Sequence, residues 1–538
     1  RRLHRRAAHH IETRDAAHLH AVSEVLLHHY EVAADRAKIV RYAAMSGGRA
    51  ASMFAVEEAR GFYHRALSAL GGDDKRLAAD RSVLYERLGD CLETAAQHKE
   101  ARDSFERALQ EWRLAPRRPR LVRTKDRLRT REGDLCRKVA VSLERRSEYD
   151  EALAWLEDAQ CALPPGSARA TAQIYTVRSL ALFRKGLYEQ ALHWGRLGLA
   201  LSGRSRDTRQ LAHAHTIFAN SYVELGRLRQ ALPHDRLAVR YYAELGDIPG
   251  QALANGNLGV SYKDLGVLDG ALYHYQLALQ GDELVGNPSR VAIMHNNIGE
   301  VLLMMGRVEE AEAHLVEAIR AHRRGSGTAG PAGNAEVIFS RCRLRRGDQR
   351  GAAHHLRRGL RLLRSVGVEG LLTDALLQKV ELRLAAADAL RARRECRRVL
   401  TAARRLEARI LEAHGERLLG RAEAALGRPE QARSHFRASV AIARQTGAGY
   451  EEALSLRDLG AILFAVPAAR RQAARVLGRA IRILSKMGAA LDLEDAEKVR
   501  EDQEAPPLDG PATDSRPGSA APEGAAAVLA GTSVSTSR

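Results

Sequence analysis

The sequence is poor in aromatic residues and in proline. Aromatic side chains account for 5% of its 538 residues, and proline occurs only 15 times. Alanine, leucine, glutamate and arginine dominate instead, and because these residues are strong helix formers the composition favours helices over sheets. The apolar share of 45% is large enough to bury a core. We therefore expect an all-α protein.

Cysteines are few and scattered, and long apolar runs are missing. The cysteines are widely separated along the chain and form no C-x-x-C pair: Cys91, Cys136, Cys161, Cys342 and Cys396. This spacing argues against a disulfide framework or a zinc knuckle and indicates a reducing compartment. The longest apolar stretch, around 459–466, is far below the ~20 residues of a membrane helix, and no secretory signal follows the opening RRLHRRAAHH. We expect a cytoplasmic protein without membrane contact and, since the chain begins without Met, a fragment of a longer protein.

Lysine is scarce, although the net charge is +19. Only 10 of the 85 basic residues are lysine, and the arginines are spread over most of the chain. Such a balance is compatible with a nucleic-acid-binding surface. Arginine bias from a GC-rich genome, distributed over solvated helix faces, explains it as easily. We favour the solvated faces and keep a nucleic-acid-binding basic α-solenoid as the alternative.

What the sequence does contain is a repeat of about 40 residues. YVELGRLRQAL begins at Tyr222 and YKDLGVLDGAL at Tyr262, with Tyr, Leu, Gly, Leu and the closing Ala-Leu at the same offsets. The closing alanine recurs at eleven positions, most of them one such period apart: Ala59, Ala101, Ala152, Ala191, Ala231, Ala271, Ala311, Ala352, Ala392, Ala432 and Ala473. In six units a glycine precedes the alanine by five positions: Gly186, Gly226, Gly266, Gly306, Gly347 and Gly427.

Each unit is predicted to be a pair of antiparallel helices. Apolar residues recur at helical spacing before and after the glycine, so Gly266 is expected at the end of the first helix, where a left-handed residue costs least without a Cβ. Gly259 and Ala271 are small because the two helices approach closely where they cross, and Tyr262 and Tyr275 fill the gaps around that crossing. Such a hairpin cannot bury its apolar face alone, so it stacks on its neighbours.

This pattern resembles the tetratricopeptide repeat. LGVSY at 258–262 with ALYHY at 271–275, and LGDCL at 88–92 with ARDSF at 101–105, match parts of its signature. The leading Trp is absent, the late Pro is mostly missing, and the period is longer than that of the usual repeat. The resemblance covers about 40–490 and implies a right-handed superhelical solenoid of about eleven helix-turn-helix repeats.

A second resemblance concerns residues 1–70. LHRRAAHHIE at 3–12, LLHHYEVAADRAKIVRYAAMSGGRAA at 26–51 and EEARGFYHRALSAL at 57–70 resemble the region after the ATPase module of bacterial AAA or signal-transduction ATPase regulators, some of which carry nucleotide cyclase or DNA-binding domains. The ATPase itself is not in this sequence, because no G-x4-G-K-[ST] motif occurs and GGDDKR at 71–76 has the wrong order. The resemblance implies the sensor arm of a larger regulator.

These observations predict three regions. Residues 1–39 are expected to be the helical region after the ATPase module, 40–500 the solenoid, and 501–538, rich in Pro, Gly, Ala and Ser, a disordered tail. A basic insert at about 115–132 lengthens one repeat, and its segment 117–132 has eight basic residues against two acidic. We favour a solvated helical connection for it over a site for nucleic acid or an acidic partner.

Catalytic and metal-binding patterns are not found. Seven histidines crowd the start without metal-ligand spacing or an H-E-x-x-H partner: His4, His9, His10, His18, His20, His28 and His29. No G-x-S-x-G elbow, Cys/His pairing or recognisable carboxylate pair is present. We expect a chain that is not an enzyme and has no cofactor or metal.

The groove of the expected solenoid is the remaining candidate site. Asn257 and Asn297 stand one repeat apart before a Leu-Gly or Ile-Gly pair. In arrays that this chain resembles, the equivalent asparagine hydrogen-bonds the backbone of an extended peptide, since an amide both donates and accepts. We expect further groove residues on neighbouring turns: Asn220, Lys263, Asn296 and Glu300. The sequence thus predicts a non-enzymatic scaffold for protein interaction and regulation that binds a peptide or partner segment.

Overall fold

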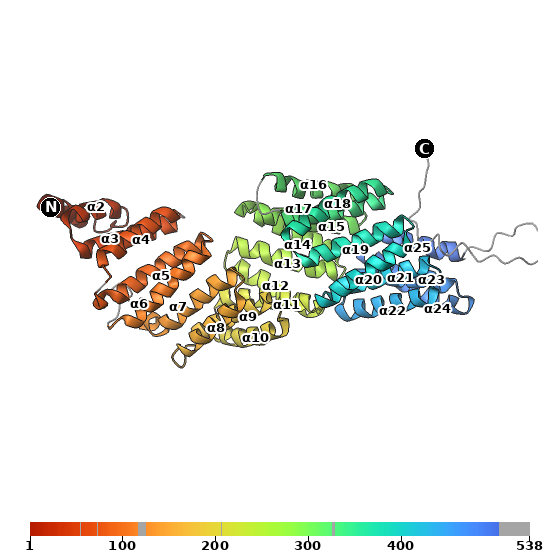
Figure 1. Ribbon diagram of the computed structural model, residues 1–538, viewed down its shortest axis with the longest axis horizontal. Helices are drawn as coiled ribbons and strands as arrows, with labels where there is room; N and C mark the ends of the chain where they lie inside the picture. Colours follow the sequence, from red (N-terminus) through yellow and green to blue (C-terminus); the bar gives the residue numbers. More distant parts are fainter. Residues whose placement is uncertain (54, 73, 117–124, 206, 325–328, 505–538) are drawn as a thin grey trace, which may run out of the picture. The chain divides into compact units, whose positions relative to one another are not determined.

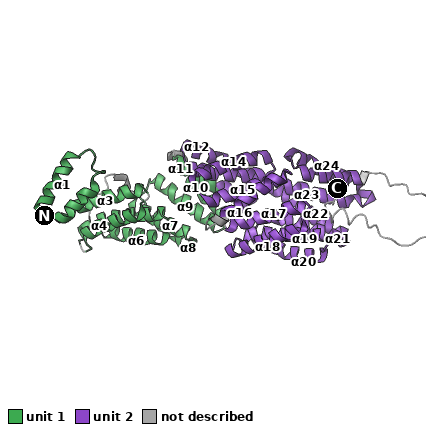
Figure 2. Cartoon of the chain, turned by 90° about the horizontal axis from the view of Figure 1, so that it is seen from above, with its two compact units in different colours: residues 1–217 green, residues 218–538 purple. Residues whose placement is uncertain are grey.

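The computed structural model describes the chain except residues 54, 73, 117–124, 206, 325–328 and 505–538 (Figure 1). All regular secondary structure in the residues it describes is helical. The chain divides into two compact units, unit 1 (1–217) and unit 2 (218–538), which Figure 2 colours separately. The prediction of an all-α fold is confirmed.

The helices follow one another with short connections. Unit 1 contains α1 Arg2–Arg14, α2 Ser23–Ala33, α3 Arg36–Ser52, α4 Val56–Leu70, a 3-10 turn Lys75–Leu77, α5 Ala78–Thr94, α6 His98–Leu114, α7 Lys125–Arg145, α8 Tyr149–Cys161, α9 Ala168–Arg184 and α10 Tyr188–Ser205. The division falls within α11 Thr208–Glu224. Unit 2 continues with α12 Leu228–Glu244, α13 Ile248–Asp264, α14 Leu268–Val285, α15 Pro288–Met304, α16 Val308–Arg324, α17 Ala329–Arg345, α18 Gln349–Val366, α19 Glu369–Ala385, α20 Ala389–Arg405, α21 Arg409–Ala425, α22 Pro429–Thr446, α23 Gly449–Phe464, a 3-10 turn Pro467–Ala469, α24 Arg470–Met487 and α25 Ala490–Glu504.

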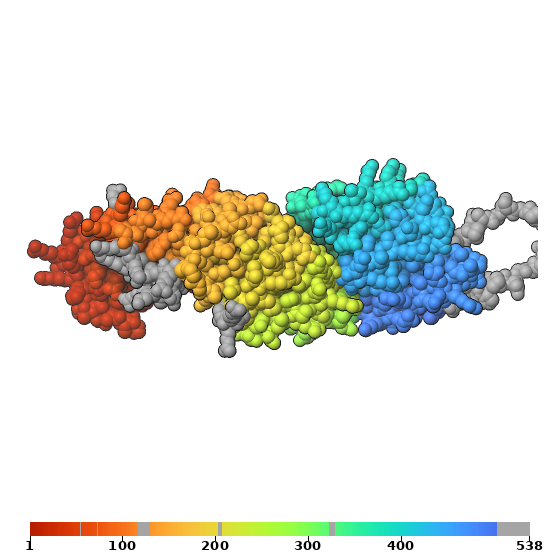
Figure 3. Space-filling model, turned by 90° about the horizontal axis from the view of Figure 1, so that it is seen from below, coloured from red at the N-terminus to blue at the C-terminus, as the bar shows by residue number. Residues whose placement is uncertain are grey.

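Consecutive helices pack in pairs, as the repeat predicts. The packed pairs are α3 with α4, α5 with α6, α7 with α8, α9 with α10, α13 with α14, α15 with α16, α17 with α18, α19 with α20, α21 with α22 and α23 with α24. Within each unit, successive pairs also contact one another, so the fold is a solenoid of stacked hairpins. Figure 3 shows the hairpins in space-filling form, coloured by their order in the sequence. The number of eleven repeats stays a prediction.

The repeated small residues mark where the helices of a pair cross. All eleven alanines of the repeat are fully buried in the second helix of their pairs. A Cβ at Gly259 would lie 2.5 Å from the ring of Tyr275, which is itself fully buried. Gly89 has the same relation to Phe105, also at 2.5 Å. Close packing leaves no room for a methyl group at these crossings, which is the physical reason why small residues recur at this place in the repeat.

The turn inside most of the described hairpins holds a left-handed residue. Gly266 has φ of 80°, and the other five glycines at this place in the repeat also have positive φ. Three units without this glycine hold another residue in the same conformation: Ala96 at 58°, Ser147 at 64° and Ala387 at 57°. The turn geometry is therefore imposed by the hairpin, and glycine is only its least costly occupant.

In unit 2, the turns of early hairpins contact the helices of late hairpins. Gly226, after α11, lies against Thr446 of α22, and Gly266, after α13, lies against Met487 of α24. Gly306, after α15, lies against Leu491 of α25. Helices that are far apart in the sequence thus share one core. The repeat pattern does not reveal this, because it predicts only contacts between adjacent hairpins.

Two predicted segments fall partly outside the described residues. Residues 117–124 of the basic insert and 505–538 of the tail are not among them. In the described part of the insert, Arg131 is 6% exposed, and its Nη1 lies 2.5 Å from a carboxylate oxygen of Glu86. This arginine is therefore not on the solvated face that we expected. None of the described helices is long and apolar enough to span a membrane.

Candidate partner-binding surface

The first helices of successive pairs form one side of unit 2, which we call the inner face. Helices α13, α15, α17, α19, α21, α23 and α25 each contact the next one in this series. The second helices of the described pairs make no comparable contacts with one another. A stack in which only the first helices touch curves toward them, so these helices line its concave side, as the resemblance implied.

Asn257 and Asn297 occupy equivalent places on the inner face. Asn257 lies on α13 and Asn297 on α15, and both are partly exposed. Nδ2 of Asn257 is buried and has no hydrogen-bond partner among the described residues. Asn297 makes no side-chain hydrogen bond within the described part of the chain. Two amide groups, one repeat apart, thus keep unused donors and acceptors.

The other two predicted asparagines differ from this pair. Asn296 is 2% exposed, and its Nδ2 donates to the carbonyl oxygen of Pro331 at 2.6 Å, which ties α15 to α17. Asn220 lies on α11 and is partly exposed. Asn296 therefore holds two hairpins together, whereas Asn257 and Asn297 make no such link among the described residues.

Lys263 and Glu300 pair with each other across two repeats. Nζ of Lys263 on α13 lies 2.8 Å from Oε2 of Glu300 on α15. Arg341 on α17 approaches the other oxygen of Glu300 at 3.3 Å and Asp374 on α19 at 2.6 Å. Four successive first helices are thus linked by charge-assisted hydrogen bonds.

The charges on this face shift the pKa of its carboxylates in opposite directions. Burial alone would raise the pKa of Glu300, but the charges of Lys263 and Arg341 outweigh burial and lower it. Burial raises the pKa of Asp264, and the charge of Glu300 adds to this effect. Burial also raises the pKa of Glu224, which faces Asp264. The carboxylates of Glu224 and Asp264 are therefore less well neutralised by positive charges than the carboxylate of Glu300.

Sequence reasoning missed the continuation of this series of charges. Glu300, Arg341, Glu381 and Arg421 each stand one repeat after the last and alternate in sign. Glu381 on α19 accepts from His414 on α21 at 3.4 Å, and Arg417 on α21 pairs with Glu451 on α23 at 2.6 Å. The alternation at the repeat period is a signal that could have found these residues.

The last helix carries two aspartates into the same network. Asp492 on α25 is 1% exposed and is contacted by Arg345 of α17 and the hydroxyl of Tyr450 of α23. Arg345 also lies 3.1 Å from Asp495, and Arg457 of α23 lies 3.4 Å from Asp492. The acidic helix α25 thus contacts the first helices of three hairpins, α15, α17 and α23.

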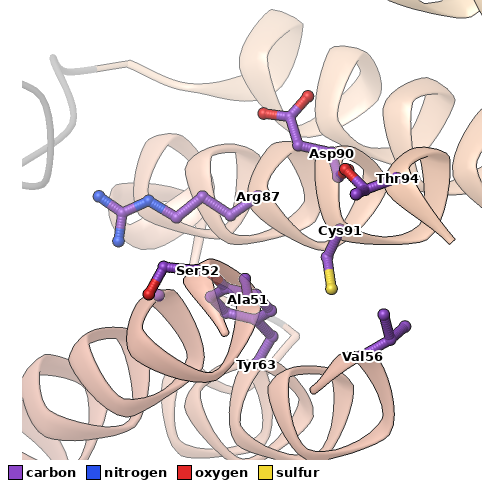
Figure 4. A pocket seen from close by; sticks show the side chains of 9 residues that line it. Ala51, Ser52, Val56, Tyr63, Arg87, Asp90, Cys91 and Thr94 are labelled. Carbon is purple, nitrogen blue, oxygen red and sulfur yellow. The ribbon is translucent and has the colours of Figure 1, made fainter. Parts of the chain in front are cut away.

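Unit 1 holds a separate pocket of about 380 Å³, lined by Gly48, Ala51, Ser52, Val56, Tyr63, Arg87, Asp90, Cys91 and Thr94. Figure 4 shows the Cys91 sulfur pointing toward α4, while the Asp90 carboxylate points away. Asp90 pairs with Lys138 at 2.6 Å. Burial raises the pKa of the Cys91 thiol, which makes this thiol less reactive.

Within the described residues, no group of three or more His, Cys, Asp and Glu side chains is arranged to hold a metal ion. The crowded N-terminal histidines instead contact one another: Nδ1 of His4 lies 2.9 Å from Nδ1 of His29, and the ring of His28 packs beside them.

Comparison with known proteins identifies the repeat and the fold. A tetratricopeptide repeat model matches residues 250–324 and 290–365. No curated protein matches the chain. A Rap protein solved in complex with the competence and sporulation factor has a TM-score of 0.53 at 13% identity, over 66% of this chain and 99% of that one. This likeness shows a shared fold.

Two further structures are less similar. The apo form of the quorum sensor NprR from B. thuringiensis has a TM-score of 0.49 at 13% identity, over 68% of this chain and 97% of that one. A signal transduction ATPase with a tetratricopeptide repeat sensor, from Pyrococcus horikoshii, has a TM-score of 0.43 at 14% identity, over 63% of this chain and 52% of that one. The chain carries tetratricopeptide repeats over 250–365 and folds as a solenoid of this type.

Proposed function

We propose that unit 2 is a protein-interaction module that binds an extended peptide or partner segment on its inner face. The observation that carries this proposal is the pair Asn257 and Asn297, whose side-chain amides have no hydrogen-bond partner among the described residues. A buried donor without a partner is costly, and the backbone of a peptide supplies both a donor and an acceptor at regular spacing. The fold is consistent with this role, because a solenoid offers a long concave surface.

A displayed library of unstructured peptides tests the proposal. Peptides are selected on the full chain, and the affinity of the best binder is measured for the variant Asn257→Ala/Asn297→Ala. We expect the double variant to lose about tenfold or more in affinity, because two hydrogen bonds to the peptide are removed, with an unchanged thermal melt. Equal affinity of the variant, or a library without any binder, would count against the proposal.

Asn287→Ala is the matched control. Asn287 caps α15 by accepting from the amide of Arg290 at 3.2 Å, away from the inner face of the helix. We expect this variant to lower the melting temperature, since losing such a cap costs about 1 kcal/mol, and to leave peptide affinity as it is. The two variants therefore separate a loss of binding from a loss of stability.

We further propose that the chain is the sensor arm of a larger ATPase-type regulator that works without catalysis of its own. This rests on the resemblance of residues 1–70 to the region after such an ATPase module. The open reading frame upstream of Arg1 is the test, and an upstream sequence without a G-x4-G-K-[ST] motif would contradict it.

Nucleic-acid binding is supported less by the arrangement of charges. Several arginines are almost fully buried and are used inside the fold, namely Arg81, Arg131, Arg178 and Arg417. A salt-dependent filter-binding assay distinguishes the two functions, because phosphate contacts give retention that falls steeply with salt. Strong, salt-sensitive retention would favour nucleic acid over a peptide.

A further inference from the structure

The C-terminal helix α25 does more than cover the end of the solenoid. The helix that ends a repeat array needs to contact only the hairpin before it, here α23 and α24. α25 contacts these helices but also α15, and Leu491 lies against the turn at Gly306. Its aspartates reach Arg345, at a sequence separation of 147 residues for Asp492. α25 therefore joins two ends of one turn of the superhelix.

α25 buries one side that carries both acidic and apolar residues. Asp492 and Asp495 stand one helical turn apart on the side that meets α17 and α23. Ala496 follows Asp492, and Val499 follows Asp495, by four residues, so they lie on the same side. Ala496 is fully buried in the core of unit 2, and Leu493 and Val499 pack against that core. A helical ligand seated in a groove buries a side of this kind.

The receiving surface on α17 and α23, which we call the cradle, consists of Arg345, Tyr450 and Arg457. Arg345 forms ion pairs with Asp492 and Asp495 and with no other residue in the described chain. Tyr450 donates its hydroxyl proton to Asp492. Arg457 pairs with Asp458 at 3.0 Å as well as with the two aspartates of α25. Without α25, Arg345 would keep its charge but lose its partners.

We propose that the cradle is a binding site for an acidic helical segment, and that α25 occupies this site as an internal ligand until a partner segment of the same chemistry displaces it. The inference rests on the proposed function of the inner face. It adds the partner's charge and the means of regulation: binding there releases α25 together with the chain that follows it.

A labelled peptide with the sequence of residues 490–504 is the probe, and the full chain is the receptor. In the variant Asp492→Asn/Ala496→Glu, α25 loses its main charge contact and carries a glutamate where a fully buried alanine stood. We expect this release variant to bind the free peptide about tenfold or more tightly than the wild-type chain, because charge pairs in a desolvated site contribute strongly. Equal, weak binding to both chains would overturn the proposal.

Arg345→Gln added to the release variant distinguishes a binding site from a simple end cap. α25 is released in both chains, but the cradle has lost its central charge, so we expect peptide binding to return to the wild-type level. A peptide with Asn at positions 492 and 495 is the matched control and is expected not to bind. Binding that is indifferent to Arg345 and to the two aspartates would show that α25 is only a cap.

Hydrogen exchange on the wild-type chain keeps the test independent of whether the variants fold. A tethered segment has an effective concentration on the order of millimolar, so free peptide at such concentrations competes with it. We expect exchange to accelerate in α25 and to stay slow in α17 and α23 when the peptide is added. No change in α25 would contradict the proposal, whereas the library experiment on Asn257 and Asn297 would remain unaffected.

Discussion

Unit 1 and unit 2 are built from the same hairpin but are held together differently. Both use a glycine of the first helix packed under an aromatic ring of the second, as in Gly47 with Tyr63 of unit 1 and Gly420 with Phe436 of unit 2. In unit 1 the ion pairs join neighbouring hairpins, for example Glu86 of α5 with Lys138 of α7. In unit 2 contacts reach across the whole turn of the superhelix. The hairpin alone therefore does not decide how cooperative a solenoid is.

The two units differ in closure, that is, in whether contacts join the late hairpins of a unit to its earlier ones. A stack with contacts between neighbours only behaves as a sum of its hairpins, and each can open with its neighbours. Once α25 links the late hairpins to α15 and α17, opening either end breaks contacts at the other. We expect unit 2 to unfold as one cooperative block and unit 1 to loosen hairpin by hairpin.

The largest expected effect comes from removing one charge partner in each unit. Asp492→Ala leaves the charge of Arg345 without a buried partner, and Glu86→Ala does the same to Arg131 in unit 1. Each change is expected to cost about 3 kcal/mol of unfolding free energy. Hydrogen exchange should accelerate in α15 and α17 as well as in α23 and α25 for Asp492→Ala, but only around α5 to α7 for Glu86→Ala. If exchange accelerated only near the substituted residue in both variants, the closure of unit 2 would be disproved.

A methyl group at a helix crossing should be about equally harmful in both units. Gly259→Ala and Gly89→Ala force a fully packed ring to move, so each is expected to cost about 2 kcal/mol, measured by denaturant unfolding. Gly256→Ala in the same helix α13 is the control, since its Cβ would meet only the end of Met294 at 3.4 Å. This control should be neutral or slightly stabilising, because alanine is the better helix former. Equal losses at Gly256 and Gly259 would contradict the packing argument.

Acidification should act with opposite signs on two carboxyl groups, Asp235 of unit 2 and Glu12 of unit 1. Burial raises the pKa of Asp235 in unit 2 to about 7, against a hydrogen bond from Ser261 that lowers it. The group is held better in its protonated form, so the contribution of Asp235 to the stability of unit 2 is lost as the pH rises toward and through about 7. Burial would raise the pKa of Glu12 in unit 1 too, but hydrogen bonds from Lys38, Tyr42 and Tyr30 outweigh it and set the pKa at about 2. Its contribution is present above the ordinary pKa of glutamate and is lost as the pH falls toward 2.

Asp235→Asn tests this contrast. The variant should flatten the dependence of unfolding free energy on pH between about 5 and 8 by roughly 2 kcal/mol, because the proton equilibrium is removed. Chemical melts at several pH values provide the measurement, and Asp269→Asn, at an exposed position of unit 2, is the control. A slope unchanged by Asp235→Asn would show that the carboxyl group ionises freely.

The smallest expected effect is a gain. Ala387 in unit 2 and Ala96 in unit 1 have φ of 57° and 58°. Glycine adopts this conformation without a steric cost, so Ala387→Gly and Ala96→Gly should each stabilise the chain by about 1 kcal/mol, measured by denaturant unfolding. Ala386→Gly, one residue earlier at a φ of −85°, should do the opposite. A stabilising Ala386→Gly would show that the backbone conformation is not the cause.

Much of the fold could be predicted because its constraints are local and repeated. The eleven alanines, the glycine at Gly259 and the turn glycine at Gly266 are all set by contacts inside one hairpin. Each contact recurs at the repeat period, so the sequence shows the same residue type at the same place in several repeats. Ala96, Ser147 and Ala387 escaped notice because they adopt the glycine conformation without being glycine.

The candidate site could be predicted only in part. Asn257 and Asn297 follow from the repeat register, which also places them on the inner face. That Asn296, next to Asn297, binds the carbonyl of Pro331 depends on how α15 packs against α17. The alternating series from Glu300 to Arg421 was readable at the repeat period, but its pairing required the distances between successive first helices.

By itself, the sequence determined the hairpin: small residues at the crossings, a left-handed residue at most of the turns and a pair of helices in every repeat. These follow from the sterics of two helices in contact, which act over a few turns. Only the tertiary structure decided that unit 2 closes and that Asp492 meets Arg345. The curvature that brings them together is the sum of small rotations between successive hairpins, and no single repeat encodes that sum.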